Sequence, residues 1–140
     1  MIKKMTKHWA EEIVNWQYEV PYDTYNMTTA YDELLSSYHA VYEETLIGFY
    51  CMGPDAQVPP GDYPDTYLDF GIGMKPNLCG KGLGEAFMVE VISELRKEGK
   101  PLRLTVLSFN KRAIKLYQKL GFKEVQQFKR GERLFIIMTE

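Results

Sequence analysis

Residues that bind metals or form disulfides are scarce in this sequence. Its 140 residues include two cysteines and two histidines: Cys51, Cys79, His8 and His39. No spacing among these residues matches a metal-ligand pattern, so the sequence predicts no metal site. Two cysteines do not make a disulfide framework, and unpaired thiols are typical of a protein in a reducing, cytoplasmic compartment.

Long apolar runs and a strong excess of one charge are also lacking. Apolar runs such as residues 134–138 are far too short to span a bilayer, and residues 1–12 lack the apolar region of a secretory signal. The formal net charge is −2, so no overall positive field would draw the protein to polyanions. The sequence therefore predicts no nucleic-acid partner, no membrane association and a cytoplasmic location.

The residues that are present are typical of one folded domain. Hydrophobic residues make up 45% of the chain and charged residues 26%, which are ordinary values for a globular protein. A chain of 140 residues can bury a core without metals or disulfides. With no repeat and no low-complexity segment, the sequence predicts a single domain over residues 1–140.

Hydrophobic periodicity and turn residues predict four helices and at least six strands. The expected helices span about 7–16, from Thr28 or Thr29 to about 36, 82–98 and 111–120. The expected strands lie in 39–53, where a tight turn near residue 44 separates two of them, and in 66–74, 102–108, 122–130 and 133–140. Thr6 and Asn110 are predicted N-caps. This order indicates an α/β (α+β) layer structure with a mostly antiparallel sheet.

The stretch KPNLCGKGLGEAF, residues 75–87, places three glycines within five residues, between an expected strand and an expected helix. Strand, glycine-rich turn and helix form a phosphate-binding layout, since backbone N–H groups can point at an anion. The spacing G-x-G-x-G does not fit the Rossmann fingerprint, and Lys81 is followed by glycine instead of the Ser or Thr of a Walker A loop. Two interpretations remain: a loop that binds the pyrophosphate of coenzyme A, and a tight turn that only packs the helix.

Two blocks of sequence resemble one family. The stretch LDFGIGMKPNLCGKGLGEAF, residues 68–87, resembles the acetyl-CoA-binding motif of the GNAT superfamily of N-acetyltransferases, a strand, a bulge and a Q/R-x-x-G-x-G/A loop that opens a helix. Gly82 and Gly84 stand at the two glycine positions, and Cys79 replaces the family's Gln or Arg. The second block, residues 105–122, is similar to the family's fifth strand and the helix after it, with the spacing Asn-x-x-Ala-x-x-x-Tyr-x-x-x-Gly-Phe. The resemblance covers about residues 38–140.

The resemblance implies a GNAT-like acyl-CoA N-acyltransferase fold. Its central sheet would be mixed and mostly antiparallel, with six to seven strands and about four helices. Strands four and five would splay apart around the pantetheine arm of acetyl-CoA. The residues expected to bind the cofactor are Ile72, Gly73, Met74, Cys79, Gly80, Lys81, Gly82, Leu83, Gly84, Glu85, Asn110 and Tyr117.

The resemblance also implies catalytic roles. Tyr117 would be the general acid that protonates the departing CoA thiolate, with a core tyrosine as the alternative. Asp69 would be the general base, directly or through water; the alternative is a carboxylate that faces solvent or a lysine. Glu19 is a second candidate base. Neither cysteine has an evident histidine partner, so direct attack by the amine is favoured over a covalent cysteine intermediate.

Six of the ten tyrosines fall between residues 18 and 42, in the region where the family forms one wall of its acceptor cleft. The residues expected to bind the acceptor are Trp16, Tyr18, Glu19, Tyr22 and Tyr25, with packing of the first helix on the sheet as the alternative. The predicted function is acetyl transfer from acetyl-CoA to a primary amine of a small molecule or a peptide. The alternative is an acyl-CoA-binding regulatory or interaction domain without catalysis. A homodimer is one option for the assembly.

Overall fold

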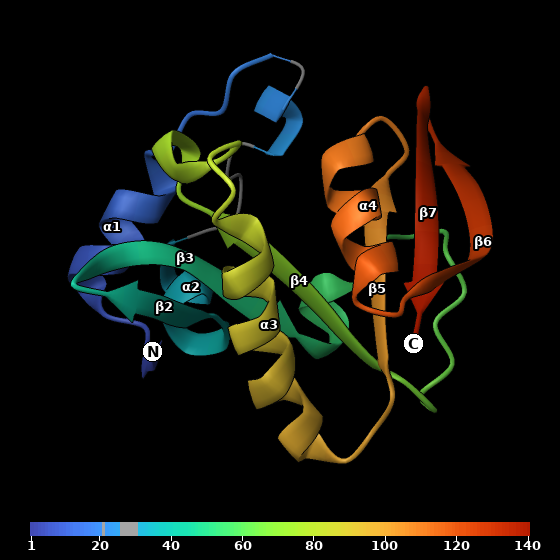
Figure 1. The fold of residues 1–140 in the computed structure, drawn as a ribbon, viewed down its shortest axis with the longest axis horizontal. Helices are drawn as coiled ribbons and strands as arrows, with labels where there is room; N and C mark the ends of the chain where they lie inside the picture. Colours follow the sequence, from blue (N-terminus) through green and yellow to red (C-terminus); the bar gives the residue numbers. More distant parts are fainter. Residues whose placement is uncertain (21, 26–30) are drawn as a thin grey trace. The chain divides into compact units, whose positions relative to one another are not determined.

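The computed structural model of the chain describes residues 1–20, 22–25 and 31–140, and Figure 1 labels its elements. The strands are β1 (Ile2–Lys4), β2 (His39–Glu43), β3 (Thr45–Met52), β4 (Leu68–Met74), β5 (Leu102–Leu107), β6 (Lys123–Arg130) and β7 (Arg133–Thr139). The helices are α1 (Lys7–Val14), α2 (Tyr31–Ser37), α3 (Gly84–Leu95) and α4 (Lys111–Lys119). Short 3₁₀ turns are η1 (Tyr22–Tyr25), η2 (Gly53–Ala56), η3 (Pro76–Leu78) and η4 (Arg96–Glu98).

The strands form a seven-stranded mixed sheet in the order β1-β2-β3-β4-β5-β7-β6. The pairs β1–β2, β2–β3, β5–β7 and β6–β7 are antiparallel, and β4–β5 is parallel. The recorded parallel register joins residues 68–70 of β4 to residues 102–104 of β5. The register ends at Phe70, as expected if β4 and β5 separate after that residue. The mixed, mostly antiparallel sheet with four helices among the described residues confirms the predicted fold class.

Contacts within the chain group into two compact units. The first unit contains residues 1–51 and 72–91, and the second contains residues 52–71 and 92–140. Both β4 and α3 contribute residues to each unit. The single domain expected over residues 1–140 therefore stays a prediction.

The first unit is built around α1, which begins at its predicted cap. Thr6 Oγ1 accepts a hydrogen bond from the backbone N–H of Trp9 at 3.2 Å. An eight-residue helix is too short to be stable alone, so its buried face supplies the stabilisation. The buried core of this unit contains Met5, Ala10, Ile13, Trp16, Leu34, Ala40 and Leu46. The cap predicted at Thr28 or Thr29 for α2 lies outside the described residues.

The second unit places α4 on one face of its strands. Asn110 Oδ1 accepts from the N–H of Ala113 at 3.2 Å and caps α4, as predicted. The ring of Tyr117 packs against Phe70, 6.5 Å between centroids, and against Phe122, 6.0 Å between centroids. Neighbouring residues of a strand point to opposite faces, so Phe70 faces α4 and Asp69 faces away from it.

Three local features differ from the sequence expectation. The strand β1 was not predicted, because three residues with two lysines give no readable alternation; it is held by pairing of Ile2 with Val41 of β2. The helix α1 ends two residues before the expected end at Trp16. The helix α3 begins at Gly84 instead of Gly82, so the first two glycines of the motif belong to the loop before it.

Close packing within the first unit explains why residue 73 is a glycine. A Cβ added to Gly73 would lie 2.4 Å from Cζ of Phe49, and one added to Gly48 would lie 2.4 Å from the carbonyl oxygen of Gly73. A side chain and the backbone of β3 therefore approach this strand closely at Gly73. A contact with a cofactor at the same residue stays a prediction.

Candidate active site

The end of β4 leads into an exposed, glycine-rich loop. Lys75 N–H donates to the carbonyl of Ile47 at 2.8 Å, which anchors the chain where it leaves the strand. Gly80 and Gly82 then have φ angles of 75° and 77°, in the left-handed region that other residues avoid. No atom lies within 4 Å of a Cβ added to Gly82. The backbone angle, and not crowding, therefore favours glycine at position 82.

This loop delivers the chain to the N-terminus of α3. The first N–H groups of a helix have no partner within the helix and carry a partial positive charge. Residues 80–83 are exposed, and α3 begins directly after them at Gly84. The segment 80–85, expected to bind pyrophosphate, is thus exposed over residues 80–83, and it shares the first unit with residues 72–74. Such an arrangement suits an anionic ligand.

Tyr18 connects the segment after α1 to the end of β4. Its hydroxyl donates to the carbonyl oxygen of Met74 at 2.7 Å. Cys79 Sγ donates to the same oxygen at 3.7 Å and to the carbonyl of Lys75 at 3.5 Å. Burial raises the pKa of the Tyr18 phenol above its ordinary value, and Cys79 adds to the effect. Tyr18 therefore remains a hydrogen-bond donor across the neutral and mildly alkaline range.

The remaining residues of the expected acceptor wall differ from one another. Trp16 is 7% exposed and lies in the core of the first unit, with Nε1 donating to Glu12 Oε2 at 3.1 Å. Trp16 thus packs in the core, which was the alternative to acceptor binding. Glu19 is exposed and Tyr22 is partly exposed, while the side chain of Tyr25 lies outside the described part of the chain.

The second unit holds the residues expected to act as acid and as cofactor cap. Asn110 is engaged as the N-cap of α4, and Tyr117 is 6% exposed in the ring cluster beneath the helix. Asn110 thus caps a helix and Tyr117 packs as a core ring. These were the alternatives to a direct contact with the cofactor. Contacts of these two residues with acetyl-CoA stay predictions.

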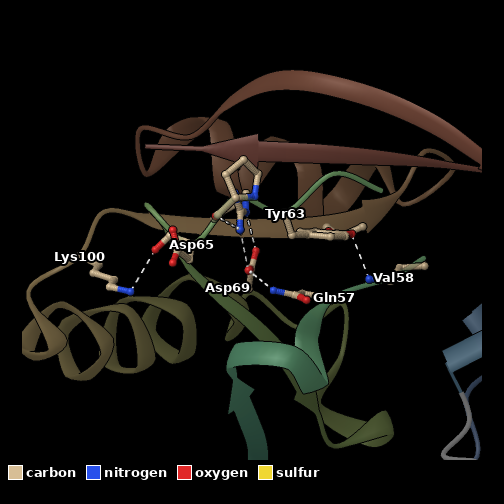
Figure 2. A network of polar contacts seen from close by, with 9 residues as sticks. Gln57, Val58, Tyr63, Asp65, Asp69 and Lys100 are labelled. Carbon is tan, nitrogen blue, oxygen red and sulfur yellow. Dashed lines mark hydrogen bonds and ion pairs between the residues drawn. The ribbon is translucent and has the colours of Figure 1, made fainter. Parts of the chain in front are cut away.

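Asp69 is a buried, fully engaged carboxylate. It is 3% exposed, and Arg103 donates through Nε to Oδ1 at 2.6 Å and through Nη2 to Oδ2 at 2.7 Å. Gln57 Nε2 adds a third bond to Oδ2 at 2.9 Å, as Figure 2 shows. Its partner is an arginine rather than the solvent or lysine of the sequence alternative. Both carboxylate oxygens are therefore occupied by donors of neighbouring side chains, in charge-assisted hydrogen bonds with the arginine.

The two predicted catalytic groups point to opposite faces of the strands in the second unit. Phe70 contacts Tyr117 on the face covered by α4, and Asp69 faces the other side with Arg103. Two groups placed in this way can act on the same substrate only where the strands no longer pair. The recorded pairing ends at Phe70 and Leu104.

Sequence reasoning missed the residues that surround Asp69. Arg103 lies in the strand LRLTVL, where it is the one charged residue among apolar neighbours. That contrast is a usable signal for a buried ion pair. The identity of the partner was not readable, because it depends on the register of β4 against β5.

A mixed sheet that includes a short parallel pair, and a glycine-rich loop at a helix N-terminus, are features that the resemblance to an acyl-CoA-dependent transferase predicts. The chain belongs to the acetyltransferase (GNAT) family, whose model matches residues 4–122. Membership of this family makes acetyl-CoA the co-substrate. No curated protein matches the chain.

Solved structures share this fold at low sequence identity. A chimera of a spermidine N-acetyltransferase from Vibrio cholerae is 18% identical, with a TM-score of 0.74 over 99% of this chain and 93% of that one. A candidate acetyltransferase from Salmonella typhimurium, solved with acetyl-CoA, is 18% identical, with a TM-score of 0.67 over 99% and 91%. A ribosomal-protein-alanine N-acetyltransferase from Brucella melitensis is 16% identical, with a TM-score of 0.67 over 100% and 98%. In the described residues, no helix has the length and apolarity needed to cross a membrane.

Proposed function

We propose that this acetyltransferase moves the acetyl group of acetyl-CoA to a primary amine by direct attack in a ternary complex. The observation that carries the proposal is the exposed loop with left-handed Gly80 and Gly82, which opens onto the N-terminus of α3. Backbone N–H groups of residues 80–85 would hold the pyrophosphate there. The family match over residues 4–122 supports acetyl-CoA as the ligand.

The chemistry needs an electrophilic carbonyl, an acid and a neutral amine. Backbone N–H near Met74 would polarise the thioester carbonyl, and Tyr117 would protonate the leaving thiolate. The amine nitrogen then forms the new bond to the acetyl carbon, the carbon–sulfur bond breaks, and the amine loses a proton. Asp69 has both oxygens engaged with Arg103, so exposed Glu19 or a water is the better acceptor for that proton.

The acceptor is proposed to be a cationic amine. Residues 1–65 contain eleven acidic and three basic side chains, and exposed Glu19 belongs to the segment expected to meet the acceptor. Acidic side chains concentrate cations near them. The similar structures are described with different acceptors, spermidine in one and a ribosomal-protein alanine in another, so the likeness supports amine transfer without selecting the amine.

The decisive experiment measures release of the CoA thiol from acetyl-CoA in the presence of a panel of amines. We expect release that depends on the amine, with polyamines and peptide amines compared at one acetyl-CoA concentration. Calorimetry under the same conditions would report binding of CoA. Binding of CoA without amine-dependent thiol release would contradict the proposal and would favour a non-catalytic acyl-CoA-binding domain.

A further inference from the structure

Arg103 organises a buried polar network on the face of the second unit opposite α4. The residue is 3% exposed and stands directly opposite Asp69 in the parallel register. Besides its two bonds to Asp69, it donates through Nη2 to the carbonyl of Pro64 at 2.9 Å. Its guanidinium lies over the rings of Tyr63 and Tyr67, 5.2 and 5.3 Å from their centroids. The cation is thus paired, hydrogen-bonded and covered by aromatic rings.

The network holds the connection between β3 and β4, residues 53–67, which we call the proline-rich loop. Gln57 of this loop binds Asp69. The Tyr63 hydroxyl accepts from the N–H of Val58 at 3.0 Å and shares a hydrogen bond with Thr105 Oγ1 at 2.8 Å. In Figure 2 the side chain of Gln57 points toward Asp69 and that of Tyr63 toward Val58. Four prolines and several side-chain bonds therefore give the loop one preferred arrangement.

The same network lies next to the point where the parallel pairing ends. The register joins Asp69 to Arg103 and, one residue further, Phe70 to Leu104. β4 then runs on to Met74, through the residues whose backbone is proposed to meet the thioester. A bidentate pair one residue before the end of the pairing ties β4 to β5 at that point.

We propose that Asp69 and Arg103 are a positioning pair for acetyl transfer, and that Asp69 does not take the proton of the amine. The pair holds the first residues of β4 and the proline-rich loop together. In this role it would help to keep the backbone of residues 72–74 in a productive orientation. This inference rests on the proposed function, since it assigns a role within that reaction. Catalysis is sensitive to such supports, because small displacements of reacting groups lower the rate strongly.

A double-mutant cycle tests the pair. Asp69→Leu and Arg103→Met each leave one buried charge without its partner, so each single variant should melt about 10 °C lower and lose activity. The double variant Asp69→Leu/Arg103→Met replaces the pair with apolar groups and should recover melting and kcat to within about 10-fold of the parent. Its pH dependence of kcat should keep the acidic limb of the parent. Arg96→Met, which breaks the exposed ion pair of Arg96 with Glu140, is the matched control and should leave kcat unchanged.

A folded double variant that stays more than about 10²-fold below the parent in kcat, with the acidic limb lost, would make Asp69 the base and overturn the proposal. Should the double variant fail to fold, Gln57→Leu decides the matter, because it removes one bond to Asp69 and leaves the ion pair. We expect it to lower kcat several-fold at an unchanged melting temperature. Gln127→Leu, on exposed β6, is its control. Parent-like kcat in Gln57→Leu would count against positioning.

The failure of the proposed function can be separated from the failure of this inference. If the parent releases no thiol with any amine, acetyl transfer is wrong. The same variants are then compared by calorimetry with acetyl-CoA. If each single variant loses affinity for acetyl-CoA and the double variant regains it, the result would favour a role of the pair in positioning β4. Equal affinity in all of them would overturn it.

Discussion

Tyr18 and Tyr117 are both largely shielded from solvent, but their surroundings give them different chemistry. The Tyr18 hydroxyl donates to a backbone carbonyl at 2.7 Å, and burial raises its pKa. Tyr117 lies in an aromatic cluster with Phe70 and Phe122. A buried phenol close to a forming thiolate can deliver its proton, whereas a phenol committed to a carbonyl serves to hold the backbone.

The role of Tyr117 is tested by Tyr117→Phe, which keeps the ring packing and removes only the hydroxyl. If this hydroxyl protonates the thiolate, kcat should fall by about 10²-fold while the KM for acetyl-CoA is nearly kept. Steady-state kinetics measure both. Tyr50→Phe, at another buried tyrosine, is the control and should stay near the parent. A Tyr117→Phe enzyme that turns over at the parent rate would make the residue structural.

The pKa of Tyr18 predicts a loss of stability in alkali. Below the ordinary pKa of about 10 the phenol is protonated in both the folded and the unfolded chain, so the free energy of unfolding does not depend on it. Above that pH the unfolded chain releases the proton first, because the folded pKa is raised. The free energy of unfolding should then fall by up to about 1.4 kcal/mol per pH unit from this residue.

Urea unfolding of the parent and of Tyr18→Phe at pH 9 and pH 11 measures this contribution. The other tyrosines titrate in both proteins, so the difference between the two isolates Tyr18. We expect the variant to be less stable than the parent at pH 9, where it lacks the bond to Met74, and to lose less between the two pH values. Equal losses in both proteins would contradict the raised pKa.

At the scale of elements, the loop between β4 and α3 combines two left-handed glycines with a helix N-terminus. The space beside Gly82 is open, so a side chain there meets the backbone angle before it meets a neighbour. A bound pyrophosphate would add a second constraint, because backbone N–H groups bind it at short range.

Two substitutions at Gly82 separate these constraints. Asn tolerates the left-handed region and Val does not. Both variants should fold, since the loop is exposed, and Gly82→Val should weaken acetyl-CoA binding at least 10-fold. If the backbone angle alone matters, Gly82→Asn should bind nearly as the parent does; if close approach of phosphate matters, it should lose affinity too. Calorimetry giving parent-like affinity for a folded Gly82→Val protein would end the pyrophosphate assignment.

At the scale of the whole molecule, the charge is unevenly distributed along the chain. Residues 1–65 are strongly acidic, although the net charge of the protein is only −2. If this part of the chain attracts a cationic acceptor, the KM for that amine should rise with salt, because ions screen charges beyond about 10 Å at 0.1 M.

Kinetics between about 0.02 and 0.5 M salt test this expectation. The KM of a polyamine should rise several-fold, while an uncharged amine analogue of similar size should change little. Glu19→Gln should reduce the preference for the cationic acceptor without altering the KM for acetyl-CoA. A preference for the polyamine that is independent of salt and of Glu19 would mean that these acidic residues play no part in acceptor recognition.

Local signals in the sequence determined the helix caps and the glycine-rich loop. Thr6 and Asn110 cap helices as their residue types predict, because a cap depends only on side-chain oxygen and the next few N–H groups. The glycine-rich loop was likewise readable from residues 79–85, since positive φ angles favour glycine wherever they occur. The family resemblance rested on the same short segments.

The tertiary structure alone decided which side chains meet. Arg103 pairs with Asp69 because β4 and β5 align them in a parallel register, and thirty-odd intervening residues give no sign of that alignment. Trp16 packs in the core of the first unit, and Gly73 makes room for Phe49. These contacts depend on the register and packing of distant segments, whereas caps and turns depend on neighbours in the chain. The sequence therefore identified the glycine-rich loop, and the fold showed that the carboxylate proposed as the base is paired with an arginine.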